Sequence, residues 1–533
     1  MHYETAHFAF YWPDTRNVAM ADAQAAGDFL ENVVWHTYMG SPIFFPEPYC
    51  NATDKKKTSI HIVDSGLSGG CNAGRPGMWI GPGALKDHWG IGHEFTHALQ
   101  CMTAGVADCN PCWFHESHAN FMPHQLPEYR SDVHCSEMLV NAPHLYYGST
   151  RDRYCNWQFW EFVKDKYCYK AVNDVWAGSA PAGQREPLSK LAATQGWDVE
   201  KLNDVFGEWA MHNISWDYRN PPPTTGTDQG SVYRSNYGVL TDKSRPERNL
   251  RLTALEPLDT SYAANRRFVS PYFWAPQRGG YNVVRLYPEA GAAAVSVRFR
   301  GVTQAGANSG WRWGLVATDA KLTTSRYSAM QRGADAELSF CVGAGESVWL
   351  VVVGAPTVMQ KIMWDQPYPS IYRYPYMIEL QGAWPAGFRN GAPEACASGE
   401  RHVNGGGCAP SNLAASVYVG PYAQVLGGNV SGNARIDDHA VVLNGATVSG
   451  GSVGALSVLM SGFSVSDTAR LETTFYPLGF FEGKSASGSA RIYGDVEYRA
   501  AKASGSYYGM VEATTASETI TEITSAPPYV WRP

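Results

Sequence analysis

The apolar residues of the first 220 positions follow both a helical and an alternating pattern. Between residues 20 and 38 they recur mostly four positions apart, which predicts a helix. Shorter runs predict strands at 7–12, 59–63 and 77–81, and we expect the last of these to line a substrate cleft. A further helix is predicted to begin at Trp157. This mixture predicts an α+β domain over residues 1–220.

Residues 230–390 change to short alternating runs, most of them followed by Gly or Pro. Side chains of a strand point alternately to its two faces, so these runs predict strands with one buried face. We therefore predict an antiparallel β-sandwich over this region. The clearest runs are 281–287, 294–300, 337–342 and 348–353.

A true internal repeat follows in residues 410–500. Aliphatic residues recur every six positions, with two gaps of five, and alanine stands two positions before many of them. A six-residue step predicts a parallel β-helix with three steps per coil, here about three coils long. The resemblance to hexapeptide-repeat proteins implies a left-handed winding. The repeated positions are Val419, Val425, Val430, Ile436, Val442, Val448, Val453, Leu459, Val465 and Leu471.

Two junctions separate these regions. The run Asn220-Pro-Pro-Pro-Thr-Thr-Gly226 is a stiff polar linker, and residues 385–410 are rich in Gly, Ala and Pro. We therefore predict domains at 1–220, 230–390 and 410–500, with a C-terminal extension at 501–533 that packs on the rest.

Composition excludes several classes of function. The 42 basic and 49 acidic residues give a net charge of −7, which argues against nucleic acid as the main partner. No apolar run reaches membrane-spanning length. We expect a monomer in solution. The first residues lack a charged and an apolar leader segment, so for a secreted protein we expect the signal peptide to be absent from this sequence.

Cysteine usage favours an extracellular protein. Eight of the eleven cysteines lie in the first third of the chain, an even number suited to four disulfides, and Cys396 and Cys408 can close a later loop. We expect Cys341 to remain single, as a buried strand thiol. A thiolate metal or redox site at Cys109 and Cys112 is the alternative. The eight are Cys50, Cys71, Cys101, Cys109, Cys112, Cys135, Cys155 and Cys168.

Candidate chemistry centres on the pattern His-Glu-x-x-His at residues 93–97. Positions i and i+4 share one face of a helix, so His93 and His97 can offer ring nitrogens to one metal ion. Glu94 then lies beside that ion, where a carboxylate can take a proton from water. Two surface histidines without a metal are the alternative.

A third ligand is predicted at Glu116, which eighteen residues separate from His97. Asn110 and Pro111 predict the start of a second helix, with Glu116 in its second turn. The two helices can present His93, His97 and Glu116 to one zinc ion and leave a fourth position open for water. Gln100 and Thr103 occupy the positions where metzincins carry Gly and His, which excludes that class.

At this point the sequence resembles the gluzincin metallopeptidases. The words HEFTHALQ and WFHESHANFM resemble those of the secreted Svx/AvrXca-type virulence proteins of plant-pathogenic bacteria. The resemblance implies Zn²⁺ held by His93, His97 and Glu116, with Glu94 as general base. It also implies that Asn120 orients a zinc-binding histidine. Residues 77–81 lack the Glu with which the aminopeptidase branch holds a free amino terminus, which favours an endopeptidase.

Gluzincins commonly stabilise the oxyanion with a Tyr or His from a later segment. We predict Tyr154 for this role, with His144, Tyr146 and Tyr147 as alternatives and aromatic packing as its other possible use. Further histidines crowd the same region. We expect them to line the cleft or lie on the surface, since the ligand set is complete without them. They are His115, His118, His124 and His134.

The sequence thus predicts a secreted zinc endopeptidase that hydrolyses extracellular proteins or glycoproteins, and the resemblance extends this to proteins of the plant cell wall. In a second hypothesis the sandwich and β-helix bind cell-wall carbohydrate or glycoprotein and the metal site is inert. In a third, the hexapeptide coils form an acyltransferase with His402 or His439 as base.

Overall fold

The computed structural model describes residues 2–513 apart from 47, 49–52, 54, 73–74, 104, 107–112, 133–136, 147–155, 179–186, 219–228, 238–249, 305, 360–371, 474–484, 495–496, 499–500, 502 and 509–511. The chain forms two compact units. The first comprises Met1–Ser136, Arg153–Leu202 and Trp216–Asn236, and the second comprises Glu137–Asp152, Asn203–Ser215 and Tyr237–Pro533. The predicted linker at 220–226 lies outside the described residues.

A five-stranded mixed sheet organises the first unit. Its order is β1 (His2–Glu4), β2 (Phe8–Tyr11), β3 (Thr58–Ile62), β5 (Arg75–Ile80) and β4 (Leu67–Asn72). The pairs β2–β3 and β3–β5 are parallel, whereas β1–β2 and β4–β5 are antiparallel. Phe10, Ile60 and Met78 are fully buried on one face, because alternate residues of each strand point the same way.

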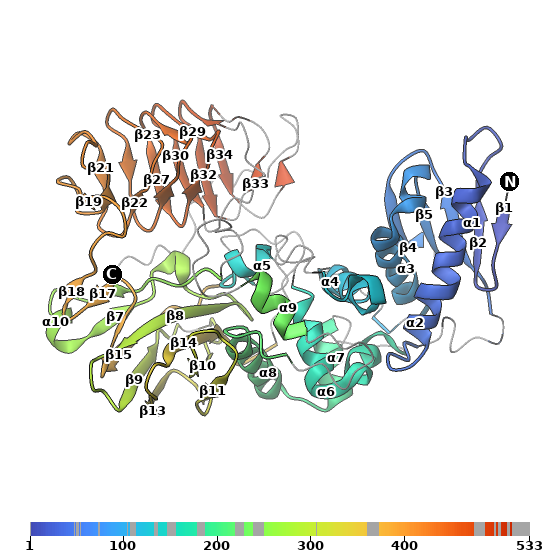
Figure 1. Ribbon diagram of the computed structural model, residues 1–533, viewed down its shortest axis with the longest axis horizontal. Coiled ribbons are helices and arrows are strands. Elements are labelled where there is room, and N and C mark those ends of the chain that lie inside the picture. Colours follow the sequence, from blue (N-terminus) through green and yellow to red (C-terminus); the bar gives the residue numbers. More distant parts are fainter. Residues whose placement is uncertain are drawn as a thin grey trace. The chain divides into compact units, whose positions relative to one another are not determined.

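Helices cover this buried face (Figure 1). Phe95 of α3 (His88–Thr103) meets Phe8 of β2 edge to face, with ring centroids 4.9 Å apart. The predicted helix over 20–38 is present as three consecutive segments, α1, a π-helical turn η1 and α2. The other helices described up to residue 236 are α1 (Met20–Phe29), η1 (Leu30–Trp35), α2 (His36–Met39), η2 (Pro82–Lys86), α4 (Trp113–Phe121), η3 (Pro123–Gln125), η4 (Pro127–Tyr129), α5 (Glu137–Asn141), α6 (Gln158–Trp176), α7 (Pro187–Gln195), α8 (Val199–His212) and α9 (Gln229–Asn236).

Two antiparallel sheets of the second unit pack on one apolar core, so the predicted β-sandwich is confirmed. One sheet has the order β11-β10-β14-β8-β16, with β12 pairing β10, and the other β13-β9-β15-β7-β6. Phe299, Trp313 and Leu350 lie in their shared core. The strands are β6 (Glu256–Pro257), β7 (Arg267–Val269), β8 (Tyr281–Pro288), β9 (Ala294–Gly301), β10 (Trp311–Thr318), β11 (Ser325–Tyr327), β12 (Gln331–Arg332), β13 (Asp335–Cys341), β14 (Ser347–Gly354), β15 (Tyr376–Gln381) and β16 (Ala383–Pro385).

Short parallel strands follow in the same unit and form three larger sheets and one of two strands. Between residues 418 and 473, paired strands stand 17 or 18 residues apart, as Tyr418 does from Arg435 and Asn429 from Thr447. Later pairs stand 21 or 15 residues apart, as Arg470 does from Arg491 and Arg491 from Ser506. The repeated aliphatic residues are buried together in one core. Most of these strands have two residues, from β21 (Tyr418–Val419) and β22 (Gln424–Val425) to β29 (Ser464–Val465). The longer ones are β27 (Ser452–Ala455), β30 (Arg470–Thr473), β32 (Arg491–Gly494) and β34 (Ser506–Tyr508).

The cysteines correct part of the disulfide prediction. Cys71 is bonded to Cys101, and the predicted pair Cys396–Cys408 is confirmed. Cys168 is free and exposed, so the eight early cysteines do not form four disulfides. Cys341 is single as predicted but exposed rather than buried, because it shares the solvent-facing side of β13 with Asp335 and Glu337. Cys50, Cys109, Cys112, Cys135 and Cys155 lie outside the described residues.

Among the described residues, no helix has both the length and the apolar character needed to cross a membrane.

Candidate metal centre

The His-Glu-x-x-His residues lie on α3. Asp87 caps this helix, since its Oδ1 accepts the N–H of Gly90 at 2.8 Å and its carbonyl accepts that of Ile91. The cap fixes where the helix begins, and His93 and His97 then follow one turn apart on the same face. Their Nε2 atoms face each other, and the two atoms are 3.1 Å apart.

Glu116 joins them from α4. Its Oε2 atom lies 3.2 Å from Nε2 of His97 and 3.4 Å from Nε2 of His93. Glu116 falls in the first turn of the described helix, while the predicted cap at Asn110 and Pro111 lies outside the described residues. Helices α3 and α4 thus bring together three residues that the sequence separates by up to 23 positions.

The three ligand atoms fit a metal ion. Donors about 2.0–2.1 Å from a tetrahedral zinc ion lie about 3.3–3.4 Å from one another, close to the spacing found here. Two imidazole nitrogens that face each other at 3.1 Å also need a proton or a cation between their lone pairs. His93, Glu94 and His97 together offer ligand atoms within 4.8 Å of one another. Glu116, with Oε2 3.2 and 3.4 Å from the two histidine nitrogens, has the spacing expected of a third zinc ligand.

Glu94 occupies a nearly dry position beside this point. Its exposed fraction is 8%, and the backbone N–H of Gly69 donates to its carboxylate. Burial raises the pKa of Glu94, the positive charge of His93 and His97 opposes this, and the negative charge of Glu116 adds to it. The carboxyl group therefore takes up a proton more readily than an exposed glutamate.

The charges of His97 and Glu116 depend on each other. Burial disfavours the imidazolium of His97, but the hydrogen bond and charge of Glu116 outweigh it and raise the pKa of His97 to about 9. Burial likewise works against the carboxylate of Glu116, yet hydrogen bonds from His93 and His97 hold its pKa well below the usual range. Both shifts favour a proton shared between His97 and Glu116.

Each histidine has a side-chain partner on its other ring nitrogen. Nδ1 of His93 donates to Oδ1 of Asn120 at 2.8 Å, the contact that the resemblance implied. Nδ1 of His97 donates to Oε1 of Gln100 at 2.9 Å. Sequence reasoning missed Gln100 and used it only to exclude metzincins, although its spacing of three from His97 places both on one helix face.

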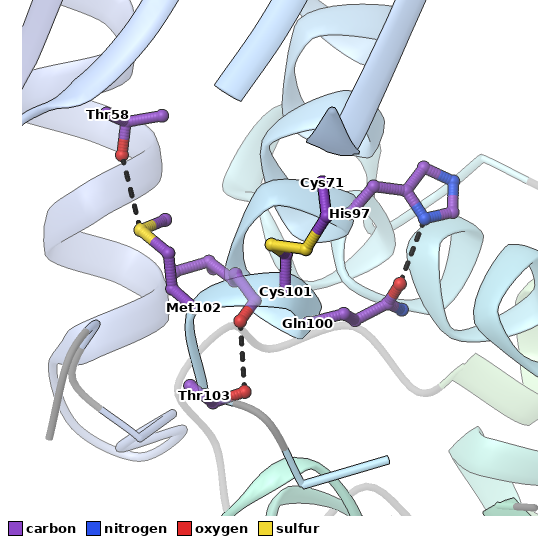
Figure 2. The surroundings of a disulfide bond; sticks show 8 residues. Thr58, Cys71, His97, Gln100, Cys101, Met102 and Thr103 are labelled. Carbon is purple, nitrogen blue, oxygen red and sulfur yellow. Dashed lines mark hydrogen bonds between the residues drawn. A yellow bond between two sulfur atoms is a disulfide. The ribbon is translucent and has the colours of Figure 1, made fainter. Parts of the chain in front are cut away.

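The strand beside the centre is β4, not residues 77–81 as predicted. Residues 77–80 belong to β5, which pairs with β3 on one side and β4 on the other. Strand β4 is the edge of the sheet among the described strands, and its Gly69 lies against Glu94. The disulfide Cys71–Cys101 joins this strand to the end of α3, immediately after Gln100 (Figure 2).

Several predicted residues lie elsewhere or outside the described chain. Tyr154, Tyr147 and His134 are outside it. His144 and Tyr146 are buried in the second unit, where Gln277 binds the backbone of both. Three of the other histidines predicted to line the cleft or lie on the surface are buried: His115, His118 and His124.

The two histidines of the acyltransferase hypothesis have protein partners within the second unit. Nε2 of His402 lies 3.0 Å from the carbonyl of Val417. Nε2 of His439 lies 3.1 Å from Oε1 of Glu256, and its ring stacks on Tyr422.

Comparison with known proteins gives one family match. The model of a family of unknown function (DUF6055) matches residues 2–387, which include the metal-centre residues and the sandwich. No curated protein matches the chain. A mitogen from Yersinia pseudotuberculosis aligns at 8% identity over 24% of this chain and 86% of its own, with a TM-score of 0.16. A family GH115 4-O-methyl-α-glucuronidase with specificity for decorated arabinogalactans aligns at 10% identity over 63% of this chain and 53% of its own, with a TM-score of 0.13. Likenesses this weak carry no argument.

Proposed function

This chain belongs to the DUF6055 family, whose function is unknown, and we propose that it is a zinc-dependent endopeptidase. The observation that supports this most directly is the spacing of 3.1–3.4 Å among Nε2 of His93, Nε2 of His97 and Oε2 of Glu116. Two imidazoles and one carboxylate form the open ligand set of a catalytic zinc site. Zinc bound there would polarise a peptide carbonyl and lower the pKa of water.

Glu94 is the general base in this proposal. Its carboxylate accepts a proton from the water that attacks the peptide carbonyl, and then gives that proton to the amine nitrogen as the C–N bond breaks. The raised pKa of Glu94 suits both steps, because a base that also serves as an acid works best with a pKa near the working pH. The N–H of Gly69 holds the carboxylate in place.

An extended substrate can be bound along β4. None of the described strands pairs with the outer side of β4, and a peptide can add to such an edge as a further strand. Strand β4 contains no Glu that could hold a free amino terminus, which favours internal cleavage over removal of single residues from an amino terminus. Tyr154 as oxyanion donor, with the alternatives named above, stays a prediction.

The proposal includes an extracellular place of action. Cys71–Cys101 and Cys396–Cys408 are typical of proteins that fold in oxidising compartments. The resemblance to Svx/AvrXca-type proteins suggests proteins of the plant cell wall as substrates. It also suggests a gluzincin-like fold for the first unit, with Asn120 as the partner of a zinc-binding histidine.

We further propose that the parallel sheets form a left-handed β-helix. Pairing at intervals of 17 or 18 residues corresponds to three six-residue steps per coil, as the hexapeptide repeat predicts. The domain limits at 220, 390, 410 and 500 stay predictions, and β34 continues one parallel sheet to Tyr508.

The test compares wild type with Glu94→Ala and Glu94→Gln for zinc content and for cleavage of casein. We expect all three proteins to bind one zinc ion and only the wild type to cleave. The exposed Glu128 provides a matched control, and Glu128→Gln should cleave like wild type.

Two other outcomes would change the proposal. Wild type that carries no zinc after reconstitution would refute the ligand assignment, and retention of the protein on insoluble wall material would then favour the binding hypothesis. Wild type that binds zinc but leaves casein intact would move the assay to wall glycoproteins.

A further inference from the structure

Gln100 connects a metal ligand to the interior of the first unit. Its side chain is buried, and it stands three residues after His97 on α3. Figure 2 shows the ring of His97 and the carboxamide of Gln100 pointing toward one another, with Nδ1 and Oε1 2.9 Å apart. The contact is therefore a direct hydrogen bond between neighbouring side chains on one helix face.

Contacts of its amide nitrogen fix the orientation of the Gln100 carboxamide. The amide nitrogen of Gln100 lies 3.0 Å from the carbonyl oxygen of His115 and 3.0 Å from Nδ1 of His118. A backbone carbonyl can only accept a hydrogen bond, so the –NH2 group must face it. The oxygen of Gln100 must then face His97, and the opposite orientation would put a carbonyl against a carbonyl.

This arrangement decides which nitrogen of His97 can bind a metal. The oxygen of Gln100 requires a proton on Nδ1, and in a neutral imidazole the lone pair then lies on Nε2. That atom is the one that faces His93 and Glu116. Because His115 and His118 belong to α4, the same network ties the ring of His97 to the helix that carries the third ligand.

We propose that Gln100 is the positioning residue for His97, holding its ring so that Nε2 faces the metal. The inference rests on the proposed zinc site and adds to it a residue that the His-Glu-x-x-His pattern does not include. Gln100 does for His97 what Asn120 does for His93. Both partners are neutral carboxamides, so neither adds negative charge to the histidines as a carboxylate would.

The test compares the variants Gln100→Met and Gln100→Glu. Methionine keeps the length of the side chain and removes the hydrogen bonds, whereas glutamate keeps an oxygen that can accept the His97 proton. Thr103→Val is the matched control on α3, because the Thr103 hydroxyl donates to the carbonyl of Leu99 in the same helix. Zinc affinity is measured by competition with a chelator, ligand geometry by the visible absorption of the cobalt-substituted protein, and folding by the melting temperature without metal.

We expect Gln100→Met to bind zinc about 10–100-fold more weakly than wild type and to change the cobalt spectrum. Gln100→Glu keeps the acceptor for His97 but loses the donor to the His115 carbonyl, so it should bind zinc more tightly than Gln100→Met and less tightly than wild type. Thr103→Val should alter neither the affinity nor the spectrum. If Gln100→Met has the zinc affinity and cobalt spectrum of wild type, the positioning role is refuted, whereas the proposed zinc site is not. Equal loss of zinc in both Gln100 variants, with the same fall in metal-free melting temperature, would assign Gln100 a structural role instead. A wild type that binds neither zinc nor cobalt would overturn the proposed function and this inference with it.

Discussion

Nδ1 of His93 lies 2.8 Å from Oδ1 of Asn120, which makes α4 the source of both a ligand and an orienting group. Asn120 stands one helical turn after Glu116, so the two side chains project from the same face of the helix. Any shift of α4 would therefore move the third ligand and the partner of the first ligand together.

Removing the amide of Asn120 should weaken metal binding. Asn120→Leu is expected to lower zinc affinity about 10–100-fold, because the ring of His93 loses the acceptor that fixes its orientation. Asn120→Asp keeps an acceptor and should bind zinc at least as tightly as wild type. Chelator competition measures both. Asn173→Leu is the control, since Asn173 is also buried in the first unit but binds the carbonyl of Ile43; an equal loss of zinc there would contradict the prediction.

Glycine is required at position 69. A Cβ atom there would lie 2.0 Å from the carbonyl oxygen of Glu94, which belongs to the backbone of α3 and cannot rotate away. Gly69→Ala should destabilise the protein by about 1–3 kcal/mol and lower turnover, because β4 must move away from Glu94. Urea unfolding and casein cleavage measure the two effects. Gly83→Ala has open space around the added methyl group and should change neither.

The metal-free protein should lose stability as the pH rises from about 6.5 to about 9. The pKa of His97 is raised to about 9 in the folded state, above its unfolded value near 6.5. Its contribution to stability is therefore complete below pH 6.5 and lost as the pH rises through 9. The melting temperature of chelator-treated protein measures this loss.

Glu116→Gln provides the control for that pH dependence. The variant removes the carboxylate that raises the pKa of His97, so the decline between pH 6.5 and 9 should become smaller. The pKa of Glu116 is lowered in the folded state, and its own contribution is present above pH 4.5 and lost as the pH falls. A decline of equal size in wild type and Glu116→Gln would show that another group causes it.

The Cys71–Cys101 disulfide should stabilise the centre as well as the fold. It spans 30 residues, and replacing both cysteines by serine is expected to cost about 2–4 kcal/mol and to speed the loss of zinc to a chelator. The pair Cys396–Cys408 spans 12 residues in the second unit. Its replacement should leave the rate of zinc loss unchanged, and an equal effect of both replacements would contradict a local role.

The sequence predicted the residues of the centre better than their surroundings. Spacing of four on a helix brings His93 and His97 together in any fold, and the cap at Asp87 lies in the same local stretch. Gln100 escaped prediction because its partners, His115 and His118, come from a second helix whose packing only the tertiary structure decides. Whether Tyr154 takes part is still a prediction, since it lies outside the described residues.

The sequence predicted strands where apolar and polar residues alternate clearly, and it missed a strand where glycine interrupts this alternation. The run Leu-Ser-Gly-Gly-Cys-Asn at 67–72 has little apolar content, yet it forms β4 because β5 offers it a hydrogen-bonded edge. The exposure of Cys341 followed from the period of two along β13, in which Asp335, Glu337 and Ser339 face solvent with it. The prediction of a buried thiol was wrong because it followed the general tendency of single cysteines to be buried and not the alternation along β13.

The disulfide between Cys71 and Cys101 also determines where the proposed enzyme can reach its final covalent structure. In the reducing interior of a cell the two thiols stay separate, and the strand that holds Glu94 is tied to α3 only by non-covalent contacts. The covalent link is added after the chain reaches an oxidising compartment. In the proposed secreted peptidase, formation of the metal centre would thereby be coupled to export, which would protect the proteins of the producing cell from cleavage.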